Sequence, residues 1–328
     1  MSAERGTARN TPRCSSPDAS GVSPALPREQ RLSSSGRIAR LELDDLTESG
    51  VVLSIDGAEQ SHVEVADPTF LLHDYTFRIA SACTALGAPA SLTTPSAQSV
   101  PSAQSVLHLG AGALTLPRWM ERERSDSHQT VVDYEEGLVD FVLETLPMAQ
   151  PPRNLVADAA AVLRDDGELA GEHFDIILVD LFNGADAPES LTGIDFFTAL
   201  LAALSPPERE GSHHDQEGSE AGALDRSLLV LNLGDVPGMR FARELVRTVL
   251  SALAQARPAI SAWDHALLSA PADVVEGAAE GNLVLTLRPF RAISTGESDG
   301  LWAVGPHPGE VLTAAQLRAW AEGAADSP

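Results

Sequence analysis

The fold of this chain is decided by the stretch Val106-Leu107-His108-Leu109-Gly110-Ala111-Gly112. An apolar strand runs directly into a turn with two glycines, and a segment with helical spacing follows. A second apolar strand then ends on an acid, Asp133, about twenty residues after the turn. A strand, a glycine turn and a helix N-terminus bring backbone N–H groups close to a ligand, and such an acid can hold a ribose diol. This layout predicts a site for a nucleotide-type ligand.

The glycine turn departs from the pattern that binds a dinucleotide. That pattern has a third glycine or alanine three positions after the second glycine, where this chain has Thr115. Instead, four features follow one another at the carboxyl ends of the first four strands, where open α/β sheets bind ligands: Gly110 with Gly112, Asp133, Asp158 with Ala159, and Asp180. Asp133 suits a ribose diol, Asp158 suits an adenine amino group, and Asp180 would face the reacting centre. The series predicts a site for a nucleoside that carries a sulfonium.

Each acid in this series also has a structural alternative. Asp133 would cap a helix expected from Glu135, and Asp158 would cap one expected from Ala159, because aspartate is a favoured N-cap residue. Asp180 follows a wholly apolar strand, so its charge needs a partner, which favours a functional role. His108 lies inside the first strand, and we expect it to be a core histidine.

Strand-like and helical segments alternate through the main part of the chain. The expected strands are Ser105–Leu109, Thr130–Asp133, Asn154–Ala157, Phe174–Val179, Leu228–Leu233, Ala266–Ser269 and Asn282–Leu287. The expected helices between them are Leu114–Arg124, Glu135–Leu146, Ala159–Leu163, Ile194–Leu204 and Met239–Ala256. Several strands are apolar on both faces, as in a sheet that is covered by helices. Residues 105–291 are therefore predicted to form an α/β domain with a doubly wound, mostly parallel, seven-stranded sheet.

The segments that flank this domain have different compositions. Residues 1–36 are rich in Ser, Pro and Arg without a secretory h-region, which predicts a disordered tail. In residues 37–90, Asp56-Gly57 between strand-like runs predicts a β-hairpin, and helical spacing from 68 to 86 predicts a helix packed under it. A tandem hexapeptide makes 91–104 a linker. Residues 206–226 are expected to be a mobile insertion, and 292–328 a C-terminal cap with a helix near Thr313–Trp320.

Charge and composition exclude several function classes. A formal net charge of −25 disfavours binding to nucleic acid or to an anionic membrane, and leaves small cationic substrates open. All 22 basic residues are arginine, which excludes lysine chemistry. The two cysteines, Cys14 and Cys83, have no disulfide or zinc spacing, and no metal site is expected. No apolar run is long enough to cross a bilayer, and we expect a cytoplasmic protein.

Taken together, the residues resemble the spermidine synthases (polyamine aminopropyltransferases), in particular their actinobacterial relatives. The resemblance covers most of residues 51–287 and rests on Ile55–Gln60, Val106–Arg118, Val131–Asp133, Asp158-Ala159 and Phe174–Asp180. It implies a Rossmann-like, methyltransferase-type domain with a small N-terminal β subdomain, which binds decarboxylated S-adenosylmethionine. By position, Asp133 would hold the ribose, Asp158 the adenine and Asp180 the attacking amine. It also implies substrate contacts by Gln60, Tyr75 and Asn183, and a homodimer.

The departures from this family fall mostly on the substrate side. The fourth-strand acid of the family opens an Asp-x-x-Asp-Pro motif, whereas Asn183 and Gly184 stand at its last two positions here. Ala113 replaces the acid that usually follows the glycine turn. After the hairpin, Asp67 alone remains of an Asp-Glu-x-x-Tyr-His/Gln-Glu pattern, and Tyr75 is a candidate for the lost tyrosine. The nucleoside half of the expected site is better kept than the polyamine half.

Three functions remain open at this point. The first is aminopropyl transfer to an amine such as putrescine. The second is methyl transfer from intact S-adenosylmethionine to a small molecule, which would explain Asn183 if that substrate carries no positive charge. The third is a binding or regulatory module without turnover. The hairpin that carries Gln60 favours the first over the second, and Asp180 favours either enzyme over the third, because a buried carboxylate without a task is costly.

Overall fold

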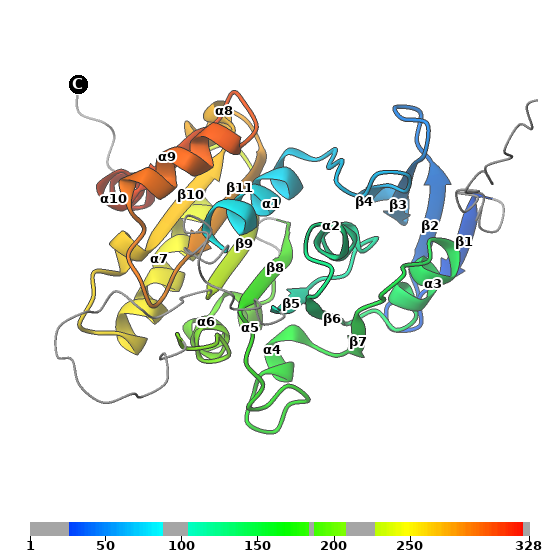
Figure 1. Ribbon diagram of the computed structural model, residues 1–328, viewed down its shortest axis with the longest axis horizontal. Helices are drawn as coiled ribbons and strands as arrows, with labels where there is room; N and C mark the ends of the chain where they lie inside the picture. Colours follow the sequence, from blue (N-terminus) through cyan, green and yellow to red (C-terminus); the bar gives the residue numbers. More distant parts are fainter. Residues whose placement is uncertain (1–25, 88–103, 184–186, 208–226, 324–328) are drawn as a thin grey trace, which may run out of the picture.

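The structure is a computed structural model that describes residues 26–87, 104–183, 187–207 and 227–323. A large sheet with helices on both faces forms most of the molecule, and a small antiparallel sheet stands beside it (Figure 1). The predicted linker and insertion, 91–104 and 206–226, fall almost entirely outside the described residues. Within the described ranges, no helix combines the length and the apolar character needed to span a membrane.

The large sheet is doubly wound and mostly parallel, as predicted. Its strands, in spatial order, are β12 (Glu310–Thr313), β10 (Ala266–Ala270), β11 (Gly281–Leu287), β9 (Leu228–Asp235), β8 (Ile176–Asn183), β5 (Ser105–Leu109), β6 (His128–Asp133) and β7 (Arg153–Val156). The pairs from β9 to β7 are all parallel, and β11 runs antiparallel to β9 and β10. The strand order reverses between β5 and β8, which is the switch point where such sheets bind ligands.

The number of strands is a correction to the sequence analysis. Within the part of the chain that the structure describes, the sheet has eight strands, because β12 from the predicted C-terminal cap pairs antiparallel with β10. β12 has four residues and a helix follows it directly. Its sequence is therefore too short to show the alternation of apolar and polar residues that indicates a strand. Its place in the sheet depends on long-range pairing and not on a local pattern.

Two cores cover the two faces of the sheet. One face packs on α1 (Asp74–Leu86), α2 (Thr115–Glu123) and α9 (Thr295–Val304). The other packs on α4 (Ala159–Val162), α5 (Glu189–Thr192), α6 (Ile194–Ala202), α7 (Arg240–Ala256), α8 (Ala272–Val275), α10 (Ala314–Glu322) and the 3-10 helix η2 (Ala262–His265). Successive strand residues alternate between the cores, as Val106 and Leu107 do. Two expected core residues are confirmed: Cys83 is buried, and buried His108 pairs with Gln129 at 2.9 Å.

The N-terminal part of the structure corrects one predicted boundary and one predicted packing contact. Its strands are β1 (Arg28–Arg31), β2 (Ile38–Leu43), β3 (Gly50–Ile55) and β4 (Ala58–Glu64), in that spatial order. The predicted hairpin turn is confirmed, with positive φ at both Asp56 and Gly57. However, β1 lies inside the predicted tail, where backbone pairing with β2 orders a polar segment. The helix expected under the hairpin, α1, instead packs on α9, β9 and β11, because its apolar side chains fit the large sheet.

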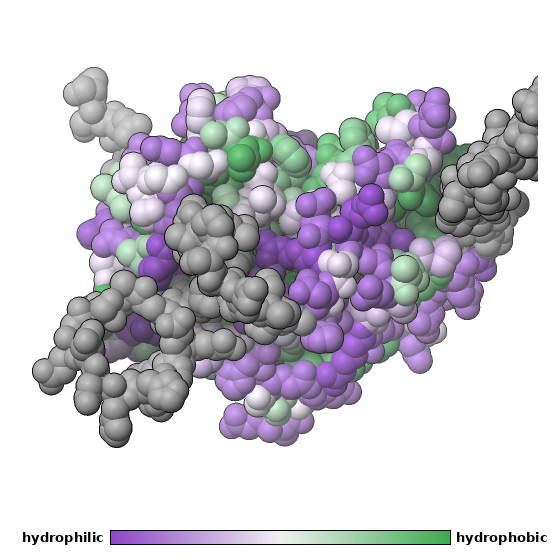
Figure 2. Space-filling model, in the orientation of Figure 1, coloured by the Kyte–Doolittle hydropathy of each residue, from purple (hydrophilic) through white to green (hydrophobic). Residues whose placement is uncertain are grey.

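The surface of the molecule is largely hydrophilic on the face shown in Figure 2. Apolar surface appears near the β2–β3 loop and over α1, and Leu46 and Phe77 are among the exposed apolar side chains of these elements. The N-terminal sheet turns its apolar side inward, where Leu41 and Leu53 pack with the glycine turn and α3 (Leu138–Thr145). This packing fixes the small sheet beside the carboxyl end of β5.

A buried arginine ties the glycine turn to the end of α3. The Arg118 guanidinium donates to the carbonyl oxygens of Ala113, Pro147 and Leu146. Its side chain is buried, and burial lowers its pKa to about 10. Loss of this guanidinium would leave the carbonyl oxygen of Ala113 at the turn, and those of Leu146 and Pro147 after α3, without this donor.

We therefore expect Arg118→Met to lose about 2–4 kcal/mol of unfolding free energy, because hydrogen bonds from a charged group to buried acceptors are lost. Urea denaturation followed by circular dichroism measures this loss. Arg122→Met, on the exposed side of the same helix, is the matched control and should change stability by no more than about 0.5 kcal/mol. Equal losses in the two variants would contradict the role of Arg118.

Candidate active site

The glycine turn is packed tightly between two other elements. Gly110 has a φ of +97°, and a Cβ on it would lie 2.5 Å from the carbonyl oxygen of Asp180. Gly112 has a φ of +48°, and a Cβ there would lie 2.2 Å from the Ser61 hydroxyl on β4. At Gly110 both the positive φ and the neighbouring main chain require glycine, whereas at Gly112 the positive φ favours glycine and the Ser61 hydroxyl would have to move to admit a side chain. The turn thus joins the end of β8 to the N-terminal sheet.

Three backbone N–H groups of the turn, those of Gly110, Ala111 and Ala113, are used inside the protein. Gly110 donates to the carbonyl of Val132 at 2.9 Å, and Ala111 donates to Asp133 Oδ2 at 2.9 Å. Ala113 donates to the hydroxyl of Ser61 at 3.1 Å. A phosphate site needs such donors free to face the ligand. The turn therefore favours a nucleoside without phosphate over a dinucleotide, in agreement with the missing third glycine.

Asp133 ends β6 beside this turn. Its Oδ2 accepts from Ala111, and its Oδ1 accepts from the N–H of Glu135 at 2.8 Å. Burial raises the pKa of the Asp133 carboxyl, and these backbone donors oppose that shift. Helix α3 begins only at Leu138, so Asp133 does not cap a helix. A carboxylate has about four lone-pair sites, and backbone N–H groups of Ala111, Glu135 and Tyr134 donate to this one, so acceptor capacity remains for a ribose hydroxyl.

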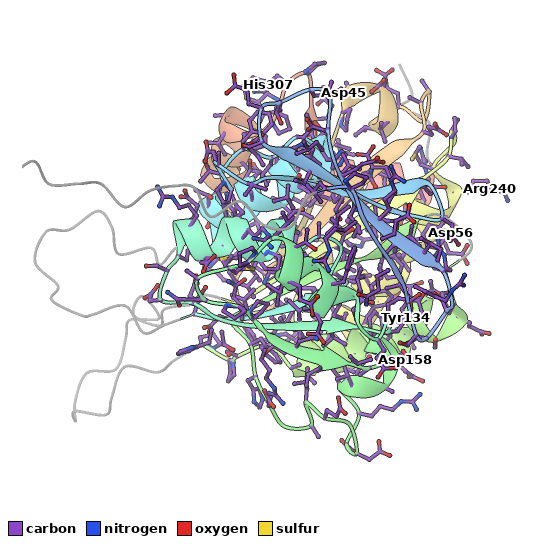
Figure 3. All side chains as sticks on the ribbon, turned by 90° about the vertical axis from the view of Figure 1, so that its right-hand side faces the viewer. Asp45, Asp56, Tyr134, Asp158, Arg240 and His307 are labelled. Carbon is purple, nitrogen blue, oxygen red and sulfur yellow. The ribbon has the colours of Figure 1, made fainter. Side chains whose placement is uncertain are left out.

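Asp158 caps a helix with one of its two carboxylate oxygens. Its Oδ1 accepts from the N–H of Ala160 at 2.8 Å and so caps α4, while Ala159 is buried behind it. The side chain is exposed, and its second oxygen is available to a ligand. Tyr134 and Val156 are exposed apolar side chains on the neighbouring strand ends, where Val156 pairs with Asp133. Figure 3 shows Tyr134 and Asp158 near one another in the lower right part of the view, and these residues come just after the paired strands β6 and β7.

Asp180 lies at the switch point, where the pairing of β8 with β9 is irregular. Its Oδ1 accepts from Asn232 Nδ2 at 2.9 Å, and the hydroxyl of Tyr75 donates to the same carboxylate. Burial raises the pKa of Asp180, and the two donors partly offset this shift. Burial also raises the pKa of Tyr75, and the Asp180 carboxylate adds to that effect. A desolvated carboxylate thus stands next to the glycine turn with two neutral donors fixing it.

His73 extends this cluster toward the surface. Its ring stacks on Tyr75, with centroids 5.9 Å apart, and its Nε2 lies 3.2 Å from Glu59 Oε1. Burial lowers the pKa of His73, against the opposing effects of Glu59 and Asp180. Glu59 is half exposed on the hairpin of the N-terminal sheet. A second carboxylate is therefore held at the outer end of the same polar cluster.

The structure distinguishes among the three expected substrate residues. Tyr75 contacts Asp180 directly, so the structure brings this pair together. The amide of Gln60 instead donates to the carbonyls of Ala58 and Glu59 on its own hairpin. The backbone of Asn183 pairs with Gly234 in β9, and its side chain lies outside what the structure describes.

Two members of the cluster were missed in the sequence. Asn232 is a polar residue within the otherwise apolar run Leu228–Leu233, and this interruption was a usable signal. His73 carried no such signal, because its meaning depends on Glu59 and Tyr75, which other elements bring to it.

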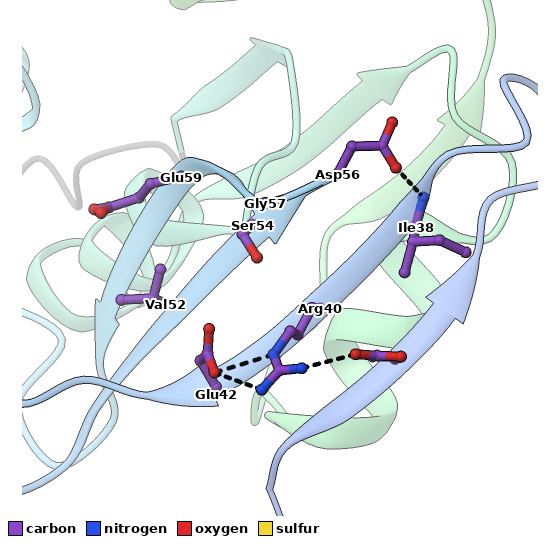
Figure 4. A pocket seen from close by; sticks show the side chains of 9 residues that line it. Ile38, Arg40, Glu42, Val52, Ser54, Asp56, Gly57 and Glu59 are labelled. Atoms are coloured by element: carbon purple, nitrogen blue, oxygen red, sulfur yellow. Dashed lines mark hydrogen bonds and ion pairs between the residues drawn. The ribbon is translucent and has the colours of Figure 1, made fainter.

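The cavity at this cluster is small. It measures about 30 Å³ and is lined by residues of β4, α1, the glycine turn and β8, among them Ser61, Tyr75, Gly110, Gly112 and Asp180. This is room for one amine-sized group. A wider groove lies on the outer face of the N-terminal sheet, around Arg40 between Glu29 and Glu42 (Figure 4). Glu59 of the polar cluster lines one side of that groove, but no site residue predicted from the sequence whose side chain is described does, so the small cavity is the better candidate for the reacting centre.

We expect Gly110→Ala to lose about 3 kcal/mol or more of stability, because it adds a clash with the Asp180 main chain to the strain of a positive φ. Gly171→Ala is the control: its φ is +75° with nothing near its Cβ, so it should lose only about 1–2 kcal/mol. Urea denaturation of both variants measures the difference. Similar losses would show that space at Gly110 is not limiting.

The raised pKa of Asp180 predicts a pH dependence of stability. The folded state keeps the proton to a higher pH than the unfolded chain, so the folded state loses stability as pH rises from the ordinary value of 3.8 through the raised pKa. Asp180→Asn removes the charge and keeps one side-chain oxygen as an acceptor. Its stability relative to the parent should rise with pH between 3.8 and the raised pKa of Asp180, because only the parent carries the titrating carboxyl group.

Thermal denaturation across this pH range tests the effect. Asp299→Asn, in an exposed part of α9, controls for the loss of one negative charge. A pH-independent difference between Asp180→Asn and the parent would contradict the account.

Comparison with known proteins gives likenesses in structure. A probable spermidine synthase from Corynebacterium glutamicum ATCC 13032 superposes with a TM-score of 0.69 at 22% identity, covering 92% of this chain and 95% of that one. Spermidine synthase from Thermotoga maritima gives 0.47 at 12% identity, covering 82% and 75%, and human methyltransferase-like protein 13 in complex with SAH gives 0.40 at 19%, covering 62% and 80%. No family model and no curated protein sequence matches the chain. The chain therefore has the same fold as the Corynebacterium glutamicum protein.

Proposed function

We propose that the chain is a spermidine synthase-like transferase, which moves the aminopropyl group of decarboxylated S-adenosylmethionine to an amine such as putrescine. The observation that carries this proposal is the Asp180 carboxylate, held by Tyr75 and Asn232 beside the glycine turn at the switch point. The structure with the same fold is described as a probable spermidine synthase, which agrees with the proposal.

The residues at the strand ends fit an adenosyl group. The carboxylate of Asp133 would accept from a ribose hydroxyl, and the free oxygen of Asp158 would accept from the adenine amino group, with Ala159 beneath it. Tyr134 and Val156 would offer apolar surface to the base between these acids. The glycine turn would lie along the nucleoside toward the sulfonium. No part of this arrangement requires the phosphate-binding N–H groups that the turn has already used.

The reaction needs an amine lone pair aimed at one carbon. The bound co-substrate would supply the aminopropyl group and a sulfonium leaving group. The C–N bond forms as the C–S bond breaks, the thioether leaves, and one proton of the amine passes to Asp180. The raised pKa of Asp180 makes this carboxylate a better proton acceptor than an exposed aspartate. Tyr75 and Asn232 fix its orientation, and positioning contributes much of the acceleration.

The outer end of the cluster suits a cationic acceptor. Glu59 would pair with a distal ammonium, with His73 between it and the reacting centre. The net charge of −25 favours the approach of such a substrate. Contacts from Gln60 and Asn183 to the acceptor, a homodimer and a cytoplasmic location are further parts of the proposal, and they rest on the sequence.

Methyl transfer from intact S-adenosylmethionine is the second candidate, because Asn183 stands where the resemblance expects a second acid. Mass spectrometry of the products separates the two. The protein is incubated with decarboxylated or intact S-adenosylmethionine, each with putrescine and with a mixed amine pool. We expect a propylamine adduct on putrescine with the decarboxylated form. A methyl adduct would decide for methyl transfer, and no adduct with either donor would contradict a transferase.

Asp180→Asn should lower turnover by about 100-fold or more, because the proton acceptor is lost. Its affinity for methylthioadenosine should stay within a few-fold of the parent, since Asp180 does not contact the nucleoside in this proposal. Isothermal titration calorimetry with methylthioadenosine and S-adenosylhomocysteine measures this binding. Equal loss of binding and turnover would make Asp180 structural, and no heat from either ligand at millimolar concentration would exclude the nucleoside site.

A further inference from the structure

The start of α1 carries two members of the polar cluster. Tyr75 is the second residue of the helix, and His73 is its N-cap residue. The side chain of His73 makes no cap hydrogen bond, so the first N–H groups of the helix lack the usual side-chain acceptor. Helix ends fray unless other contacts hold them. The hydroxyl of Tyr75 must nevertheless keep one direction in order to donate to the Asp180 carboxylate.

Asp74 lies between these two residues, and an arginine one turn further along α1 holds it. Nε of Arg78 donates to Asp74 Oδ2 at 2.6 Å, and Nη2 donates to Asp74 Oδ1 at 3.1 Å. In this bidentate geometry, two parallel hydrogen bonds fix the orientation of the carboxylate as well as its distance. The side chain of Asp74 is 41% exposed, whereas that of Arg78 is 2% exposed. The buried arginine therefore restrains the half-exposed acid.

The Arg78 guanidinium is also anchored outside its own helix. Nη1 donates to the Ser269 hydroxyl on β10 at 2.9 Å, and Nη2 donates to the Pro306 carbonyl at 3.3 Å. Ser269 is buried, and β10 belongs to the sheet that carries Asp180 on β8. Gly309 leaves room for the guanidinium, because a Cβ on it would lie 2.7 Å from Arg78 Nη2. The first turn of α1 is thus tied to the sheet that carries the reacting carboxylate.

We propose, on the basis of the function above, that Arg78 is a positioning residue of the transferase, which acts through Asp74 to hold the Tyr75 hydroxyl in line with Asp180. The described lining of the cavity at Asp180 does not include Arg78, so Arg78 acts through its neighbours and not on the substrate. With the Tyr75 donor in place, the carboxylate keeps one orientation toward the cavity where the amine would bind.

The protonation of Asp180 separates this role from a general effect of charge. Burial raises the pKa of Asp180, and the donors at its carboxylate lower it. The hydroxyl of Tyr75 is one of these donors, and His73 acts in the same direction through its charge. Asp74→Asn removes a negative charge, and this loss by itself would lower the pKa of Asp180. Release of the Tyr75 donor would instead raise that pKa, so the two effects have opposite signs.

The test is the pH profile of kcat/KM for putrescine in Asp74→Asn. Activity is lost as pH falls through the pKa of Asp180, because the ionised carboxylate accepts the proton. We expect the acid limb to move to higher pH, and kcat to fall about 3- to 10-fold through misalignment. The KM for decarboxylated S-adenosylmethionine should stay within about two-fold of the parent. Arg78→Lys keeps the charge without the bidentate geometry, and should shift the acid limb in the same direction.

Two further variants complete this experiment. In a Tyr75→Phe background, Asp74→Asn should have little further effect, because the group that it positions is already absent. Glu322→Gln is the matched control, since Glu322 forms an i,i+4 pair with Arg318 on α10 and is similarly exposed. It should leave the rate and the profile unchanged. An acid limb that moves to lower pH in Asp74→Asn, or a multiplicative loss in the double variant, would overturn the assignment while leaving the transferase function intact.

A second measurement does not depend on turnover. The chain has two tyrosines, Tyr75 and Tyr134, so NMR of the protein with ring-labelled tyrosine can follow each one, and Tyr134→Phe assigns them. The Tyr75 signal of the parent should follow the protonation of Asp180, and Asp180→Asn should abolish this response. Asp74→Asn should weaken it. An unchanged response would overturn the assignment, whereas a weakened response without product from any amine would contradict the proposed function alone.

Discussion

The contact between the glycine turn and the end of β8 is the constraint on which the rest of the site depends. Gly110 lies so close to the main chain of Asp180 that no side chain fits between them. The same turn lies against Ser61 of β4 and holds Asp133 through the N–H of Ala111. One tight turn thus sets the positions of Asp133, Asp180 and the N-terminal sheet. In close-packed protein interiors, a shift of one of these groups would be transmitted to the others.

The N-terminal sheet is therefore part of the site and not an appendage to it. Its strand β4 provides Ser61 to the glycine turn, and the carbonyl of His62 accepts from the Thr115 hydroxyl at 2.9 Å. The β3–β4 hairpin also places Glu59 beside His73 at the outer end of the polar cluster. A bare doubly wound sheet has no wall on this side of the switch point. The small sheet and the start of α1 supply that wall and the polar groups on it.

At Asp180, burial and hydrogen bonding shift the pKa of the carboxyl in opposite directions. Burial disfavours the charged carboxylate, and two neutral donors, Tyr75 and Asn232, compensate only in part. The result is a carboxylate that keeps its geometry and binds a proton more readily than an exposed aspartate. Asp158 shows the opposite solution, because it is exposed, caps α4 with one oxygen and leaves the other oxygen to solvent. Asp180 within β8 and Asp158 at the start of α4 thus have opposite surroundings, one carboxylate desolvated and the other exposed.

The sequence by itself determined the seven main strands, the glycine turn and the acids at the strand ends, because strand periodicity and glycine requirements are local. It also indicated the Asp56-Gly57 hairpin, whose turn needs positive φ. Only the tertiary structure decided the pairing of β1 and β12, the packing of α1 on the large sheet, and the contacts of Tyr75, His73 and Asn232 with one another and with Asp180. These features depend on residues far apart in the chain, and long-range packing leaves no periodic signal in the segments that it joins.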